Sequence, residues 1–160
     1  MLKVTLLTVG KVKEKYLRDG IDEYAKRLSR YCNLSILEME DEKTPDEASE
    51  TEEELIKKKE ADRLFKYIKD DAYVIALAIN GRQLDSPEFS KKIDSLGLSG
   101  KSNLTFIIGG SLGLHDSILK RADMLLSFSK MTFPHQLMRM IFLEQLYRAY
   151  RIMKNEPYHK

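Results

Sequence analysis

Two strongly apolar segments of strand length constrain the fold of this chain more than any other feature of its sequence. Residues 73–79 are apolar throughout, and residues 104–108 are apolar except for Thr105 and stop at two glycines, Gly109 and Gly110. Strands that are apolar at every position are typical of parallel sheets, in which helices cover both faces. The sequence therefore predicts an α/β fold with a mainly parallel sheet flanked by helices.

The rest of the chain alternates in the same way between strand-like and helix-like segments. We expect further strands at residues 2–9, 34–39 and 124–127. We expect helices at residues 16–31, after residue 49, from residue 86, at residues 115–121 and from residue 134 to residue 153.

Local signals predict where two helices begin and where one strand ends. Ser49 with Glu52, or Thr51 with Glu54, predicts a capping box at the start of the second helix. Asn80-Gly81 predicts a turn that ends the strand at residues 73–79. Ser86, followed by Pro87, is expected to be the N-cap of the next helix.

Length and charge limit the domain organisation and the partners. With 160 residues, we expect one domain spanning 1–160. The net charge of +2 hides an acidic segment at residues 38–60 and a basic one at 121–160. This asymmetry favours a polyanion near the C-terminal end, but on charge alone two solvated faces are the better explanation. The lone Cys32 excludes an intrachain disulfide, and the apolar start is too short to span a membrane. We expect a cytoplasmic protein.

The last helix carries apolar residues around most of its circumference. A helix of this kind must be buried on more than one side. One interpretation is a central helix of the monomer, and the other is that one face forms a homodimer interface. We favour the homodimer. Beyond this helix, composition alone predicts a frayed tail.

Several common site patterns are missing. The loop Gly109–Gly113 lacks the first glycine of a dinucleotide motif, and neither a P-loop nor a nucleophile elbow occurs. The histidines His115, His135 and His159 show no zinc-binding spacing, so we expect no metal. The glycines fit either a tight turn or a ligand lying against bare backbone. Arg148 and Arg151 share a helical face and, with Tyr158, are candidates to grip phosphates and stack on a base, or are merely solubilising.

Five segments together resemble one known family. They are Gly-Lys-Val-Lys-Glu-Lys-Tyr at 10–16, Ile-Ile-Gly-Gly-Ser-Leu-Gly-Leu at 107–114, Ser-Phe-Ser-Lys-Met-Thr-Phe-Pro-His-Gln-Leu-Met-Arg at 127–139, Glu-Gln-Leu-Tyr-Arg-Ala at 144–149 and the final Pro-Tyr-His-Lys. The chain resembles, over essentially its whole length, the bacterial ribosomal RNA large subunit methyltransferase H family, a minimal member of the SPOUT class.

The resemblance implies a fold and an activity. It implies a SPOUT-type α/β fold with a C-terminal trefoil knot, a homodimer, and S-adenosyl-L-methionine as cofactor. It implies methylation of N3 of a pseudouridine in 23S rRNA within the assembled ribosome. Family cofactor contacts map onto Leu77, Gly109, Phe128, Ser129, Lys130, Met131, Thr132 and Phe133. The family's active-site tail maps onto Tyr158, His159 and Lys160.

The mechanism that we expect needs a base for the imide proton. Imidazole has an ordinary pKa of about 6.5, so His159 and His135 are candidates, with His159 preferred. Arg148 is expected to stabilise the imide anion, and Phe128, Met131 or Phe133 to cover the adenine ring. The alternative is that positioning alone drives transfer, with Tyr158 and His159 holding the base.

Two other functions remain open at this point. One is a non-catalytic RNA-binding or ribosome-associated module that uses the same basic helix. The other is a nucleotide-dependent oxidoreductase, which the missing glycine of the loop disfavours.

Overall fold

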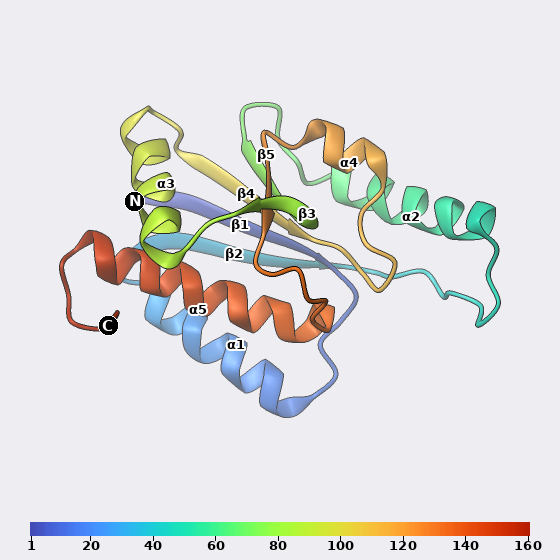
Figure 1. Cartoon of the computed structure of the whole chain (residues 1–160), viewed down its shortest axis with the longest axis horizontal. Coiled ribbons are helices and arrows are strands. Elements are labelled where there is room, and N and C mark those ends of the chain that lie inside the picture. The colour runs from blue at the N-terminus through green and yellow to red at the C-terminus, as the bar shows by residue number, and fades with distance from the viewer.

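The computed structural model describes residues 1–160 and contains one five-stranded sheet (Figure 1). Every strand pair is parallel, and the strand order is β2-β1-β4-β3-β5. The predicted α/β fold with a parallel sheet is confirmed. The strands are β1 (Leu2–Val9), β2 (Cys32–Met39), β3 (Tyr73–Gln83), β4 (Asn103–Ile108) and β5 (Met124–Ser127).

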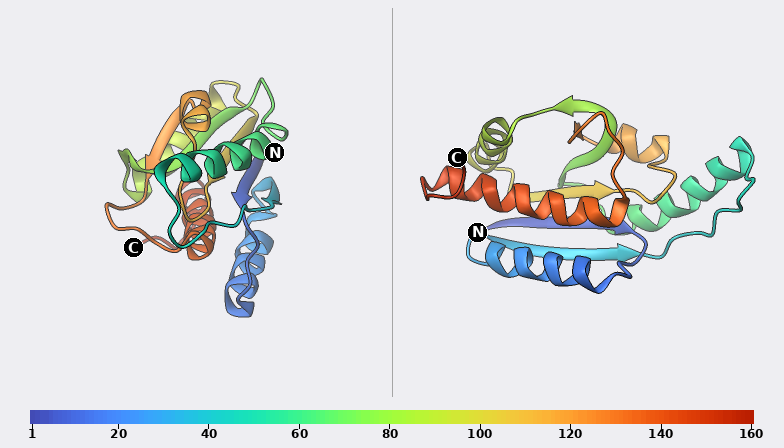
Figure 2. Two further views of the ribbon diagram at one scale, coloured as in Figure 1. Left: turned by 90° about the vertical axis from the view of Figure 1, so that its right-hand side faces the viewer. Right: turned by 60° about the horizontal axis from the view of Figure 1, so that its bottom comes forward.

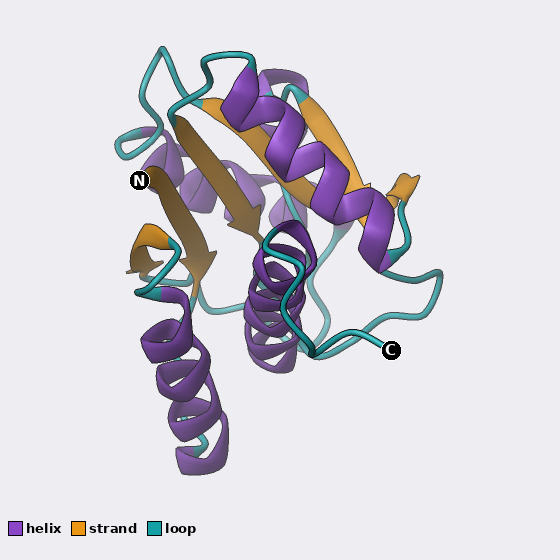
Figure 3. Cartoon of the chain, turned by 90° about the vertical axis from the view of Figure 1, so that its left-hand side faces the viewer, coloured by secondary structure: helices purple, strands orange, loops and turns teal.

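Helices cover both faces of the sheet (Figures 2 and 3). One face carries α1 (Lys15–Leu28), α3 (Ser86–Leu98) and α5 (His135–Met153), and the other carries α2 (Glu50–Phe65) and α4 (Asp116–Arg121). Along β1, Val4 and Leu6 belong to the first core, whereas Leu7 and Val9 belong to the second. Burial on both faces explains why the central strands are apolar without alternation.

The strand β3 is longer than predicted, because it does not end at Asn80-Gly81. It continues to Gln83, and Leu126 of β5 pairs with both Leu77 and Arg82. The residues between them therefore pass around β5. A side chain at Gly81 would place its first carbon 2.7 Å from the backbone carbonyl carbon of Leu125, so glycine permits this close crossing. The trefoil knot remains a prediction.

The helix starts follow the predicted chemistry with one correction. Ser49 and Glu52 form the predicted capping box of α2. The N-cap of α3 is Asp85 and not Ser86, because the Asp85 carboxylate accepts the backbone N–H of Glu88 at 2.8 Å. An anionic cap also complements the positive end of the helix dipole. Ser86 is thereby free to donate its hydroxyl to Gln145 Oε1 at 2.7 Å.

The last helix is central within the single chain. α5 lies between α1 and α3 and contacts β4, and its buried residues include Phe142, Leu143 and Leu146. Contacts within one chain thus cover much of its apolar surface, and the homodimer interface remains a prediction. None of the helices is both long and apolar enough to cross a bilayer.

Candidate active site

The C-terminal tail is tied to α5, which corrects the expectation of a frayed end. Asn155 adopts a positive φ of 54° and turns the chain back. Arg151 Nη1 then pairs with Glu156 Oε2 at 2.8 Å, and the hydroxyl of Tyr31 donates to the same carboxylate at 3.0 Å. Arg151 Nη2 also donates to the Pro157 carbonyl at 3.1 Å. These bonds place Tyr158 and His159 beside the middle of α5.

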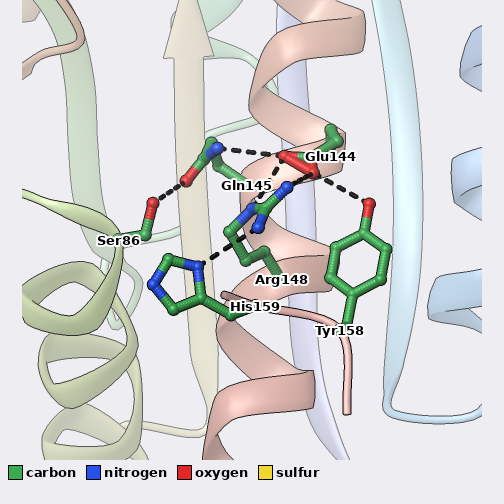
Figure 4. A network of polar contacts seen from close by, with 6 residues as sticks. All are labelled: Ser86, Glu144, Gln145, Arg148, Tyr158 and His159. Atoms are coloured by element: carbon green, nitrogen blue, oxygen red, sulfur yellow. Dashed lines mark hydrogen bonds and ion pairs between the residues drawn. The ribbon is translucent and has the colours of Figure 1, made fainter.

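A hydrogen-bonded network joins this tail to α5 and α3 (Figure 4). The carboxylate of Glu144 is its centre. Arg148 donates to it twice, from Nε at 3.2 Å and from Nη2 at 2.9 Å. The Tyr158 hydroxyl donates at 3.0 Å and Gln145 Nε2 at 2.9 Å. Gln145 in turn accepts from Ser86, so the network extends to the start of α3.

His159 ends the network at the surface. Its Nδ1 lies 3.2 Å from Nη1 of Arg148. Because a guanidinium can only donate, Nδ1 is the acceptor and a neutral ring carries its hydrogen on Nε2. The basic lone pair of the exposed imidazole therefore faces Arg148. His159 can accept a substrate proton there only after this contact is released.

Electrostatics fix the protonation of Tyr158 and Arg148. Burial, together with the hydrogen bond to Glu144, raises the pKa of Tyr158 to about 12. The phenol therefore stays protonated near neutral pH and serves as a donor and not as a base. The hydrogen bond from Arg148 to Glu144 raises the pKa of that guanidinium, whose central carbon lies 4.7 Å from the Tyr158 ring centroid. The cation is thus held by an anion and an aromatic face.

The second candidate base, His135, lies elsewhere. It is the first residue of α5, thirteen positions before Arg148, which is about 20 Å along a helix axis. Its ring is half-buried near Arg139, and burial lowers its pKa. Arg139 is itself fully buried and bonds Glu38 Oε2 and the Val9 carbonyl, each at 2.8 Å. Within one chain, the fold does not bring His135 to the network.

The predicted cofactor segments follow three neighbouring strands. β3 lies between β4 and β5, with Ala76 opposite Ile107 and Leu77 opposite Leu126. Gly109 follows β4 and Phe128 follows β5, so the fold gathers all three segments at one edge. Gly109 is buried, and a side-chain carbon there would lie 2.9 Å from the Gly113 backbone, which limits this position to glycine.

A cavity of about 370 Å³ opens beside this edge. Phe128 and Phe133 are the only two of the eight predicted cofactor residues that line it. Ser86 and Gln145 line it as well, so the cavity meets the network that leads to His159. The remaining lining residues are Leu84, Asp85, Phe89, Leu126, Ser127 and Ile141.

The segment between the two phenylalanines forms its own turn. The Ser127 hydroxyl donates to the Ser129 carbonyl, and the Ser129 hydroxyl accepts the N–H of Met131, both at 3.0 Å. Lys130, Met131 and Thr132 are exposed, with Met131 75% accessible. These side chains stand outside the cavity.

Sequence reasoning missed Glu144, Gln145 and Ser86. Glu144 precedes Arg148 by four residues, the spacing at which oppositely charged side chains meet on a helix, so this pair was detectable. Ser86 and Gln145 are 59 residues apart, and no local signal joins them. No group of three or more His, Cys, Asp or Glu side chains is arranged to hold a metal ion.

Comparison with known proteins gives consistent matches. The family model described as predicted SPOUT methyltransferase matches residues 2–159. A protein of Bifidobacterium adolescentis named ribosomal RNA large subunit methyltransferase H is 66% identical over 99% of this chain and 100% of its own length. Proteins of the same name from Clostridium kluyveri and Clostridium beijerinckii are 61% and 60% identical with the same coverage.

A solved structure supports the fold alone. The structure of a probable methylase family protein from Haemophilus influenzae aligns with a TM-score of 0.56, at 13% identity, over 100% of this chain and 72% of that one.

Proposed function

Since the chain belongs to the SPOUT methyltransferase family, we propose that it transfers a methyl group from S-adenosylmethionine to N3 of a pseudouridine in 23S rRNA. The observation that carries this proposal is the junction of the cavity at Phe128 and Phe133 with the polar network of Gln145, Glu144, Arg148 and His159. A pocket for the methyl donor would thus lie beside polar groups that can accept the proton of an N–H group and stabilise the resulting anion. A non-catalytic RNA-binding module has no need of such a pocket, and the family match also weighs against an oxidoreductase.

The cavity fits a cofactor of this kind. Its volume of about 370 Å³ falls within the range of small-molecule sites, and its lining combines aromatic walls with a few polar groups. Phe128 and Phe133 would hold the adenine ring, and Ser127 and Asp85 would reach its polar atoms. Leu77, Gly109 and the backbone of residues 129–132 would complete the binding site. When bound, S-adenosylmethionine supplies an electrophilic methyl group on a sulfonium.

The network prepares the substrate nitrogen for attack. N3 of pseudouridine bears a proton that must leave as the new N–C bond forms, and we assign its removal to His159. Arg148 faces the oxygens of the imide and stabilises the negative charge that develops on them. Glu144 orients Arg148 through two hydrogen bonds, and Tyr158 packs against the guanidinium.

Proton removal by His159 requires a rearrangement, because its Nδ1 accepts from Arg148 in the single chain. We propose that the chain acts as a homodimer and that the tail of one subunit completes the donor site of the other. The support is the exposure of His159 and Lys160, which leaves both side chains accessible to a second subunit. Within one chain, the length of α5 separates His135 from Arg148, so we do not assign the proton transfer to His135.

The assembled ribosome is the proposed substrate, and the cytoplasm the proposed location. A net charge of +2 provides little general attraction for naked RNA. Because this electrostatic attraction is weak, we favour a substrate surface formed by several parts of the ribosome over an isolated RNA hairpin.

Calorimetry and a transfer assay test the proposal together. Titration with S-adenosylmethionine should release heat with one site per chain or per dimer, and ribosomes lacking the modification should accept methyl groups. Binding without transfer to any ribosomal substrate would contradict the proposed substrate. A chain that binds no donor would instead be a non-catalytic binding module.

A further inference from the structure

Residues 10–16, the loop after β1 together with the first two residues of α1, present basic and aromatic side chains near the start of α5. Lys11, Lys13 and Lys15 are exposed, and Tyr16 keeps 70% of its surface accessible. Val12, within the loop, is only 8% accessible and anchors it to the core. The proposed chemistry uses none of these residues.

This loop is held in one conformation. The backbone N–H of Val12 donates to Glu38 Oε2 at 3.2 Å, and that of Lys13 donates to Gln136 Oε1 at 3.1 Å. Gly10, at φ 89°, donates its N–H to the Met39 carbonyl at 2.7 Å. A surface fixed in advance loses less conformational entropy when it binds a partner.

Most of the cations in this region have no anionic partner. Only Lys15 forms an ion pair, with Asp19 at 2.6 Å. Lys11, Lys13 and the exposed Arg18 form none. Lys11 and Arg18 also border a groove of about 480 Å³ whose floor includes the Arg139–Glu38 pair. Asp22 lines the same groove and Glu14 lies between Lys13 and Lys15, but neither forms an ion pair with Lys11, Lys13 or Arg18, so these three cations are available to an anion.

The position of the loop connects it to the proposed donor site. In the parallel pairing of β1 with β4, Thr8 is opposite Ile108, so the chain leaves these strands at Gly10 and Gly110 side by side. Gln136, which holds Lys13, follows Phe133 by three residues, and in Figure 1 the loop passes beside the start of α5. The chain that leaves β1 continues to β2, at one edge of the sheet, whereas the chain that leaves β4 continues to β5, at the other edge. Ligands of open α/β sheets bind at such a reversal.

On the premise of the proposed function, we propose that this loop is a docking surface for the RNA substrate. Lys11, Lys13 and Arg18 contact backbone phosphates, and Tyr16 stacks on an unpaired base. Phosphate contacts from lysine and arginine position an RNA, and exposed aromatic rings bind single-stranded bases by stacking. Lysine is depleted at the centre of protein–protein interfaces, so this mixture fits RNA better than an acidic protein.

Steady-state kinetics of methyl transfer to ribosomes test this docking surface. The variants are Lys11→Ala/Lys13→Ala and Tyr16→Ala, with Lys101→Ala/Lys120→Ala as the matched control, since it also removes two exposed lysines and Lys120 lies in α4, on the other face of the sheet. Lys101 precedes β4 and so lies where the strands begin, away from the loop. Melting curves establish that each variant is folded, and calorimetry gives the dissociation constant for S-adenosylmethionine.

The loop variants should raise KM for ribosomes and leave the donor dissociation constant unchanged. We expect about a fivefold or larger rise for Tyr16→Ala, the effect of losing one stacked base, with Tyr16→Phe restoring KM. The double lysine variant should reduce the slope of log KM against log salt by about one to two, as the loss of two phosphate contacts requires. The control should match the wild type.

The failure of this inference is distinguishable from failure of the proposed function. A wild-type enzyme that methylates ribosomes, with loop variants of unchanged KM, would overturn the docking surface and leave the activity standing. In the double lysine variant, a raised KM with an unchanged salt slope would mean that the lysines contact something other than phosphates, such as a ribosomal protein, and would also overturn it. A wild-type chain without transfer activity would refute both.

Discussion

The Nδ1 atom of His159 accepts a hydrogen bond from Nη1 of Arg148 at 3.2 Å, across eleven residues of sequence. This contact connects the last turn of the tail to the centre of α5. It links the residue that we propose as the base to the residue that we propose as the anion stabiliser.

Replacement His159→Ala should remove most turnover and leave donor binding intact. General-base assistance is typically worth about 10²–10⁴-fold in rate, and the imidazole lines no part of the donor cavity. The measurement is kcat for methyl transfer, with the donor dissociation constant from calorimetry. Lys120→Ala, an exposed change on α4, is the matched control. Full activity of His159→Ala would assign catalysis to positioning alone.

Replacement Glu144→Gln should lower kcat by up to about 10²-fold, because a misplaced catalytic group costs about this much. The neutral amide cannot accept two charge-assisted hydrogen bonds from Arg148 as the carboxylate does. The donor dissociation constant should change little. If kcat is unaffected, Arg148 does not depend on Glu144 for its orientation.

Replacement Gly81→Ala should destabilise the fold by roughly 1–3 kcal/mol or more, as overpacking does. The new methyl group would lie 2.7 Å from the Leu125 backbone, which cannot move aside as a side chain can. Gly97→Ala in α3 is the matched control, because nothing lies within 4 Å of that position. Replacing a glycine of the last helical turn that does not adopt a positive φ should stabilise the fold by about 0.4–1 kcal/mol. Urea unfolding measures both, and equal stability of the two variants would contradict the close crossing of β3 and β5.

Replacement His135→Asn should weaken the pH dependence of stability on the acid side of neutrality. Burial lowers the pKa of His135 in the folded state, so below about pH 6.5 the unfolded chain binds more protons. The stability from the neutral ring is present above that pH and is lost as the pH falls through the folded-state pKa. Free energies of unfolding from pH 8 to about pH 5 measure this effect. A variant with the wild-type slope would show that His135 does not contribute to it.

The sequence predicts features that depend on local patterns and not those that depend on distant contacts. The bounds of β1 follow from residue order alone, and residue order limits the capping box of α2 to two pairs, of which the structure has Ser49 with Glu52. Asn80-Gly81 is a strong local turn signal, yet β3 continues past these two residues because Arg82 and Gln83 pair with β5. Composition predicts a frayed tail because it cannot show that Arg151 and Tyr31 bind Glu156.

The candidate site shows the same difference between features set by local patterns and features set by distant contacts. The three cofactor segments are recognisable as strand ends, but which side chains line the cavity depends on packing, and only Phe128 and Phe133 do. The sequence gives two candidate histidines and prefers His159, but only the structure shows that the length of α5 separates His135 from Arg148. Gln145 and Ser86 meet only because α3 packs on α5.

Mass spectrometry of 23S rRNA tests the central claim most directly. RNA would be compared between cells that contain this protein, cells that lack it, and cells that carry only the His159→Ala variant. We expect one methyl group on a pseudouridine in the first sample, the unmethylated pseudouridine in the second, and little methylation in the third. The same methylated pseudouridine in cells without the protein would contradict the proposed activity.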